Sequence, residues 1–175
     1  MKIVSVSENQ SIEKRIAITP EIAKKYISFG FEVFLSKNYG AHLGITDKEY
    51  QIVGVKTSND EKEILNDANV IVQLGLLSDD KCSLLKQDQT LIGVLNPYDN
   101  KNKLDNLIKK KINVFSLELL PRITRAQSMD ILSSQANLAG YKAVIESFAN
   151  FEKAIPMMMT AAGTIPAAKV LVVGA

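Results

Sequence analysis

Short apolar runs alternate with longer helical patterns along most of this chain, and each run has the length of one β-strand. The runs predict strands at Ile3–Val6, Glu32–Leu35, Val70–Gln73, Leu91–Leu95, Ile112–Phe115 and Val170–Val173. Strands separated by crossover helices are typical of a parallel sheet. The pattern therefore predicts an α/β fold, namely a doubly wound parallel sheet of Rossmann-like or flavodoxin-like type, with helices on both faces.

Capping residues mark the ends of the predicted helices. Helix starts are predicted at Thr19, which precedes Pro20 and Glu21, and at the capping boxes Thr46/Glu49 and Ser58/Glu61. Gly30 is expected to close the first helix, because glycine readily adopts the left-handed conformation of that position. The pair Asn96-Pro97 is expected to end a strand in a turn that leads to a helix at about 102–109.

The last third of the chain has a different organisation. Leu138, Tyr141, Ile145 and Phe148 recur at spacings of three and four, which predicts a helix from about Asp130 to Phe151 with Asp130 as its N-cap. Residues 157–166 are small, apolar and interrupted by Gly and Pro, and are interpreted as an inter-domain connector whose methionines fill gaps in a core. The predicted domains are residues 1–130, a connecting helix and connector at 131–168, and residues 169–175.

The segment after Lys169 resembles the beginning of another domain. Val170–Val173 is predicted to be a buried strand that leads into Gly174, the first glycine of a dinucleotide-binding turn. The later glycines, the following helix and the ribose-binding acid of such a turn are absent from these residues. We therefore expect the first strand of a truncated NAD-binding Rossmann domain here, with Gly174 as a cofactor-binding residue.

Composition excludes several classes of function. The net charge of +2 gives no electrostatic case for binding nucleic acid or an acidic membrane. One cysteine and one histidine provide neither a disulfide framework nor the spacing of a metal site. We expect no signal peptide and no direct membrane insertion, since no stretch approaches the roughly 20 apolar residues of a membrane helix.

Polar side chains gather between Pro121 and Tyr141, just after the predicted strand at Ile112–Phe115. Ligands are usually held at the ends of strands in α/β proteins. A nicotinamide cofactor needs amide partners for its carboxamide, a carboxylate near its oxidised ring and a cation near its pyrophosphate. Side chains of these types are Arg122, Gln127, Asp130 and Ser133. The alternative is that an Arg–Asp pair and N-cap hydroxyls only hold the entrance of the helix, and the spacing alone leaves both open.

Arg15 is a second candidate for binding. It follows the first predicted strand and precedes the first predicted helix, which is where a parallel sheet holds its ligands. An ordinary surface arginine fits the same position.

The run from Pro121 to Tyr141, PRITRAQSMDILSSQANLAGY, resembles the signature of the alpha subunit of proton-translocating NAD(P) transhydrogenases. Residues 157–174 are similar to the segment that leads into the NAD-binding domain in that family. Arg15 with Ala17–Pro20, and Gly30–Val33, match the N-terminal module shared by alanine dehydrogenases and transhydrogenases. The resemblance covers essentially the whole chain.

The resemblance implies an NAD(H)-binding subunit that passes hydride to NADP(H), held as co-substrate on a partner domain, with coupling to proton translocation. Arg122, Gln127 and Asp130 would be the catalytic set, and Ser133 would join them in contacting the cofactor. Implied partners are a second alpha subunit in a homodimer and the NADP-binding and membrane domains. The implied location is peripheral, on the cytoplasmic face of the bacterial inner membrane, for a chain that is itself soluble.

Two departures bear on the choice between the relatives. The resemblance places Gln73 and Val94 where alanine dehydrogenases hold pyruvate with a lysine and a histidine. A glutamine offers no cation and a valine cannot act as acid or base, which disfavours an amino-acid dehydrogenase. Gln73 also departs from the basic residue common among transhydrogenases, so its role stays open. The remaining alternatives are an alanine-dehydrogenase-like enzyme and a non-catalytic truncated fragment.

Overall fold

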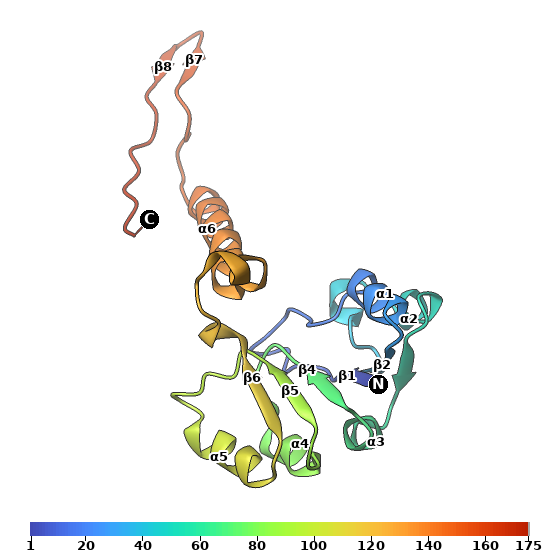
Figure 1. Ribbon diagram of the computed structural model, residues 1–175. Coiled ribbons are helices and arrows are strands. Elements are labelled where there is room, and N and C mark those ends of the chain that lie inside the picture. The colour runs from blue at the N-terminus through green and yellow to red at the C-terminus, as the bar shows by residue number, and fades with distance from the viewer. Residues whose placement is uncertain (175) are drawn as a thin grey trace. The chain divides into compact units, whose positions relative to one another are not determined.

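Six parallel strands form the centre of the first of two compact units, residues 1–129, in a computed structural model that describes residues 1–174 (Figure 1). In chain order the strands are β1 (Lys2–Ser5), β2 (Glu32–Ser36), β3 (Lys56–Ser58), β4 (Val70–Val72), β5 (Thr90–Gly93) and β6 (Asn113–Ser116). Their order in the sheet is β3-β2-β1-β4-β5-β6. This order reverses direction between β1 and β4, as in doubly wound folds.

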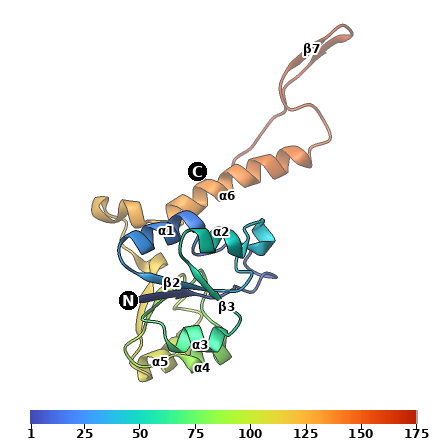
Figure 2. The ribbon, with the colours of Figure 1, turned by 90° about the vertical axis from the view of Figure 1, so that its right-hand side faces the viewer.

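Helices cover both faces of this sheet (Figure 2). One face carries α1 (Pro20–Ser28) and α2 (Asp47–Ile52), and the other carries α3 (Glu61–Asn66), α4 (Asp79–Leu84) and α5 (Lys101–Lys109). Two clusters of buried side chains match these layers, one with Ala23 and Tyr50 and the other with Leu65 and Leu107. The predicted doubly wound α/β fold is confirmed.

The central strand β1 shows how the sequence builds the two layers. Ile3 packs in the cluster beneath α1 and α2, whereas its neighbour Val4 packs in the cluster beneath α3 to α5. Successive side chains of a strand point to opposite faces, so a run of consecutive apolar residues serves both cores. Val4 is paired in parallel with Phe34 of β2 and with Ile71 of β4.

The caps that the sequence predicted are mostly present. Thr19 accepts a hydrogen bond from the Ile22 amide, and Thr46 with Glu49 forms a complete capping box. Gly30 follows α1 with a φ of +86°. The predicted capping box at Ser58 is wrong, because Asp60 is the N-cap of α3 and Ser58 ends β3.

The short elements β3 and α4 are among those of the first unit that had no sequence prediction. β3 is a three-residue strand at the edge of the sheet, and its residues Lys56–Ser58 have no apolar pattern. The helix α4 has six residues and is therefore too short to show a helical period.

The second unit begins at Asp130 and contains α6 (Ile131–Ala149) and an antiparallel hairpin of β7 (Met158–Thr160) and β8 (Gly163–Ile165). The predicted long helix and its Asp130 cap are confirmed. None of the α6 side chains is buried, and its exposed apolar residues include Leu138, Tyr141 and Val144.

Two predictions for this unit are wrong. Met157–Met159 fill no core in this chain, since their side chains are 46–83% exposed and two of them belong to the hairpin. The predicted strand Val170–Val173 is not formed, and its residues are 70–90% exposed. A strand needs a neighbour to complete its hydrogen bonds, and none of the described residues pairs with this segment.

Candidate functional site

The reversal point of the sheet, between β1 and β4, is where doubly wound proteins usually bind ligands. Here Gln73, the residue after β4, is buried there with 3% of its surface exposed. Its Oε1 accepts hydrogen bonds from the Val6 amide and the Ser5 hydroxyl, both at 2.8 Å. Its Nε2 donates to the Val6 carbonyl at 3.1 Å and to Glu8 Oε1 at 3.2 Å. The Gln73 amide therefore joins the ends of β1 and β4, and all of its hydrogen-bond donors and acceptors are used.

Glu8 closes the same place from the β1 side. Its Oε1 also accepts hydrogen bonds from the amides of Leu74 at 2.7 Å and Gly75 at 3.4 Å. Burial raises the pKa of the Glu8 carboxyl above its usual range, although these backbone bonds oppose the shift. The carboxylate thus fixes the segment that follows β4.

Tyr39 extends the network on the other side of Ser5. The two hydroxyls lie 2.7 Å apart, and Tyr39 Oη also accepts from the amides of Ala17 and Ile18 at 3.0 and 3.3 Å. Burial raises the pKa of the Tyr39 phenol, so it stays protonated at neutral pH. The segment before α1 is thereby held against the end of β1.

A cavity of about 360 Å³ opens beside Glu8, and its two cations are already paired. Lys81 Nζ lies 2.8 Å from Glu61, and Lys103 Nζ lies 3.1 Å from Asp79. Gln73 thus fills the crevice, and both lysines of the neighbouring cavity are in ion pairs.

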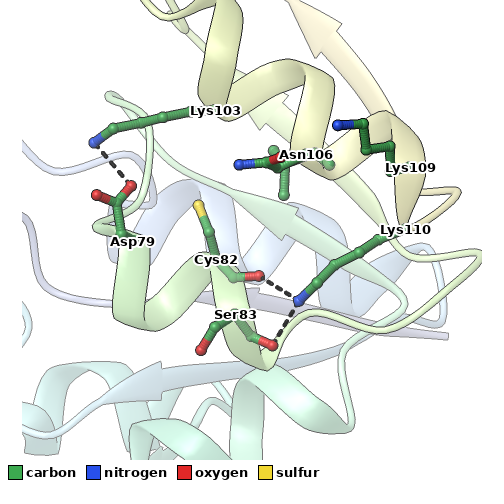
Figure 3. A pocket seen from close by; sticks show the side chains of 8 residues that line it. Asp79, Cys82, Ser83, Lys103, Asn106, Lys109 and Lys110 are labelled. Carbon is green, nitrogen blue, oxygen red and sulfur yellow. Dashed lines mark hydrogen bonds and ion pairs between the residues drawn. The ribbon is translucent and has the colours of Figure 1, made fainter.

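A second cavity, of about 330 Å³, lies between α4 and α5 (Figure 3). Lys110 donates to the carbonyls of Cys82 and Ser83 at 3.2 and 2.6 Å, where cations suit the end of a helix. Burial raises the pKa of the Cys82 thiol, which leaves it protonated and a poor nucleophile. Lys110 thereby joins the end of α5 to the end of α4.

The candidate cofactor residues begin at the carboxyl end of β6. After β6 the chain makes a 3₁₀ turn, η2 (Leu117–Leu119), and then a second one, η3 (Thr124–Met129). Ala126 is buried, whereas Arg122 and Gln127 are exposed. Within residues 1–174 neither side chain has a hydrogen-bond or ion-pair partner, and the same holds for Arg125. The polar side chains on either side of the buried Ala126 are thus available to a ligand.

Asp130 and Ser133 form the cap of α6. Asp130 Oδ1 accepts from the Ser133 amide at 3.0 Å, and Oδ2 accepts from the Ser133 hydroxyl at 2.6 Å. The structure therefore brings these two predicted residues together, in the structural role that the sequence allowed. Gly174, with a φ of +84°, makes no hydrogen bond to either of them among the described contacts.

Arg15 is exposed and bound to a neighbour. Its Nε and a terminal nitrogen donate to the two carboxylate oxygens of Glu13 at 2.8 and 2.6 Å. This hydrogen bonding lowers the pKa of Glu13. This pairing with a residue nearby in the sequence is what an ordinary surface arginine would show.

Sequence reasoning missed the polar network around Gln73. The available signal was the presence of Ser5 and Gln73 inside or directly after otherwise apolar strands. It also missed Glu118, a lone carboxylate in the apolar run Leu117–Leu120.

Residues 1–174 contain neither a metal-binding cluster nor a membrane-spanning helix. No group of three or more His, Cys, Asp or Glu side chains is arranged to hold a metal ion. No helix in this range combines the length and the apolar character needed to cross a bilayer.

Comparison with known proteins identifies the family. The model of the alanine dehydrogenase/PNT N-terminal domain matches residues 5–139. The chain belongs to this family. It is 47% identical over 178 residues to the first part of NAD(P) transhydrogenase subunit alpha from Rickettsia prowazekii, covering 99% of the chain and 46% of that protein. A second such protein, from Rhodospirillum rubrum, is 43% identical over 179 residues, with 99% of the chain and 47% of the relative covered.

The solved structures agree with this placement. The crystal structure of transhydrogenase from Sinorhizobium meliloti is similar with a TM-score of 0.88 at 40% identity, covering 95% of this chain and 50% of that one. The chain thus spans about half the length of the relatives that it matches.

Removing the Gln73 amide tests how much the network at the reversal point stabilises the protein. Gln73→Leu keeps the volume but leaves the Val6 amide and carbonyl and the Ser5 hydroxyl short of partners, so we expect a loss of about 2–4 kcal/mol in the free energy of unfolding. Urea denaturation measures it. Gln87→Leu, at an exposed glutamine, is the matched control and should change little. Equal stability of the two variants would show that the Gln73 bonds contribute nothing.

Proposed function

We propose that this chain is part of the NAD(H)-binding subunit of a proton-translocating NAD(P) transhydrogenase, in which hydride passes between NADH and NADP⁺. The observation that carries the proposal is the pair of exposed side chains Arg122 and Gln127 after the carboxyl end of β6, neither of which has a partner within residues 1–174. High identity to proteins named as transhydrogenase subunits supports it. NAD(H) would be the cofactor at this loop, and NADP(H) would be held by a partner domain.

The loop suits nicotinamide chemistry in the following way. Bound NADH would supply the hydride, so the protein contributes orientation and charge and needs no general base. Arg122 would orient the cofactor with its planar set of donors, a geometry that lysine does not reproduce. Gln127 would bridge toward the domain that carries NADP(H).

Asp130 and Ser133 would act at the same end of the cofactor. The Asp130 carboxylate would favour the positive oxidised ring, and its bonds to Ser133 hold it in one orientation at the start of α6. Capping and cofactor contact are compatible, because a carboxylate offers about four acceptor positions. Gly174 remains a proposed contact to the pyrophosphate.

The alanine dehydrogenase alternative has little support from the site. Gln73 is buried and fully bonded, and the Val94 amide donates to the Leu74 carbonyl. Neither residue offers the charge or the proton that amino-acid oxidation needs. The 19% identity to an L-alanine dehydrogenase, with a TM-score of 0.63 over 67% of this chain and 32% of that one, reflects the shared fold.

The exposed apolar side chains of the second unit support the proposal of a partner. Those of α6 and the hairpin include Leu138, Tyr141, Phe148 and Met159. Many exposed apolar side chains are typical of a surface that contacts another protein. We assign it to a second copy of the chain, in a homodimer that associates with the NADP-binding and membrane parts of the transhydrogenase on the cytoplasmic side.

Substitutions in the loop distinguish positioning of the cofactor from binding of the cofactor. Arg122→Ala, Gln127→Asn and Asp130→Asn, built into the natural protein and reconstituted with its partners, should slow single-turnover hydride transfer by up to about a hundredfold, since small misplacements are costly. NADH dissociation constants should change far less. Asparagine caps helices about as well as aspartate, so Asp130→Asn removes the charge and one acceptor but keeps an acceptor for the Ser133 amide.

Arg125→Ala is the matched control for Arg122→Ala, because Arg125 is also exposed and unpartnered within residues 1–174. It should transfer hydride at the normal rate. Normal rates in all three site variants would show that the loop only holds the entrance of α6.

The dimer is checked by sedimentation of the natural protein at micromolar concentration, where a dimer is expected. Tyr141→Glu places a charge on the exposed face of α6 and should shift the protein toward monomer. A monomeric wild-type protein would contradict the assignment of this surface.

A further inference from the structure

Glu118 connects the start of the cofactor loop, residues 121–130, to the turn that follows β5. It lies in η2, between the end of β6 and Arg122. Its Oε1 accepts a hydrogen bond of 2.5 Å from the backbone amide of Asn96, which follows β5. The Glu118 side chain thus bonds the segment between β6 and Arg122 directly to the turn after β5.

The turn to which Glu118 is hydrogen-bonded has a restricted backbone of its own. Asn96 has a φ of +45° and is followed by Pro97, whose ring restricts the backbone on both sides. The Asn96 carbonyl accepts from the amides of Asp99 and Asn100 at 3.1 and 2.9 Å. The Asn100 side chain donates to the Leu95 carbonyl at 2.9 Å. A bond to this turn therefore fixes the start of the cofactor loop to a well-ordered turn next to the sheet.

The second oxygen of Glu118 takes no part in the bond to Asn96. Oε2 and the nearby Ser116 hydroxyl are shielded from solvent, and neither has a hydrogen-bond partner within the described residues. A carboxylate in such surroundings costs free energy compared with an amide of the same shape. Glutamine would keep the acceptor for the Asn96 amide and would remove that cost.

We propose that Glu118 is a positioning residue for the cofactor loop, and that it acts through the hydrogen bond from its Oε1 to the Asn96 amide. This inference rests on the proposed function of the loop. Arg122 lies four residues beyond Glu118, so a shift of η2 moves the guanidinium relative to the sheet. Such displacements change the rate of a positioned reaction more than the affinity for its cofactor.

The test uses Glu118→Ala, Glu118→Asp and Glu118→Gln in the natural protein with its transhydrogenase partners. Single-turnover hydride transfer, the NADH dissociation constant and amide hydrogen exchange over residues 121–129 are measured for each. Glu152→Ala, at an exposed glutamate of the second unit, is the control. Glu118→Asp keeps the charge but shortens the reach, and it serves if the alanine variant does not fold.

Loss of the bond should slow hydride transfer by about tenfold or more in Glu118→Ala, and less in Glu118→Asp, with NADH affinity changed by less than about threefold. Amide exchange over 121–129 should become faster in both. Glu118→Gln and Glu152→Ala should match the wild type within about twofold. Rescue by glutamine is the signature of the hydrogen bond.

Unchanged exchange over 121–129 in Glu118→Ala would overturn the inference whatever the rates. A glutamine variant as slow as the alanine variant would overturn it too, because charge would then be the cause. If Glu118→Ala loosens the loop but neither it nor Arg122→Ala slows hydride transfer, the proposed function of the loop fails and Glu118 is left as a structural brace only.

Discussion

The side-chain amide of Gln73 holds the two central strands together at the point where the sheet reverses its order. It bonds to both backbone groups of Val6 and to the Ser5 hydroxyl, and Glu8 and Tyr39 extend the network on either side. These groups satisfy one another in a place that water barely reaches, where unpaired polar groups would be costly. The crevice in which this fold usually receives a ligand is therefore occupied by the protein itself.

Because the reversal point is filled, the groups available for a ligand lie elsewhere, at the carboxyl end of β6. There the bond from Glu118 to the Asn96 amide holds the start of a loop in which the Arg122 and Gln127 side chains have no protein partner within residues 1–174. Binding residues on a loop that a rigid sheet supports are typical of α/β proteins. The first unit thus combines a closed centre with an open polar edge, which is suited to touching one end of a cofactor whose other end is held elsewhere.

Sequence reasoning predicted the sheet, its helices and the cap at Asp130, because apolar period and capping chemistry are local signals. It did not find β3 or α4, which are too short or too polar to carry a period. It placed a strand at Val170–Val173, but a strand depends on a neighbour that no local pattern reveals. The loop residues followed from residue type and resemblance. The bonds of Gln73 and Glu118 could not be predicted, since each joins segments that are distant in the sequence.

The central claim is that the cofactor contacts the β6 loop and leaves the reversal point of the sheet untouched. Amide hydrogen exchange of the natural protein, compared with and without saturating NADH, tests it most directly. The account predicts slower exchange over residues 121–133 and no change at Val6 and Leu74, whose amides are already bonded to Gln73 and Glu8. Slower exchange at Val6 and Leu74, with an unchanged loop, would contradict it.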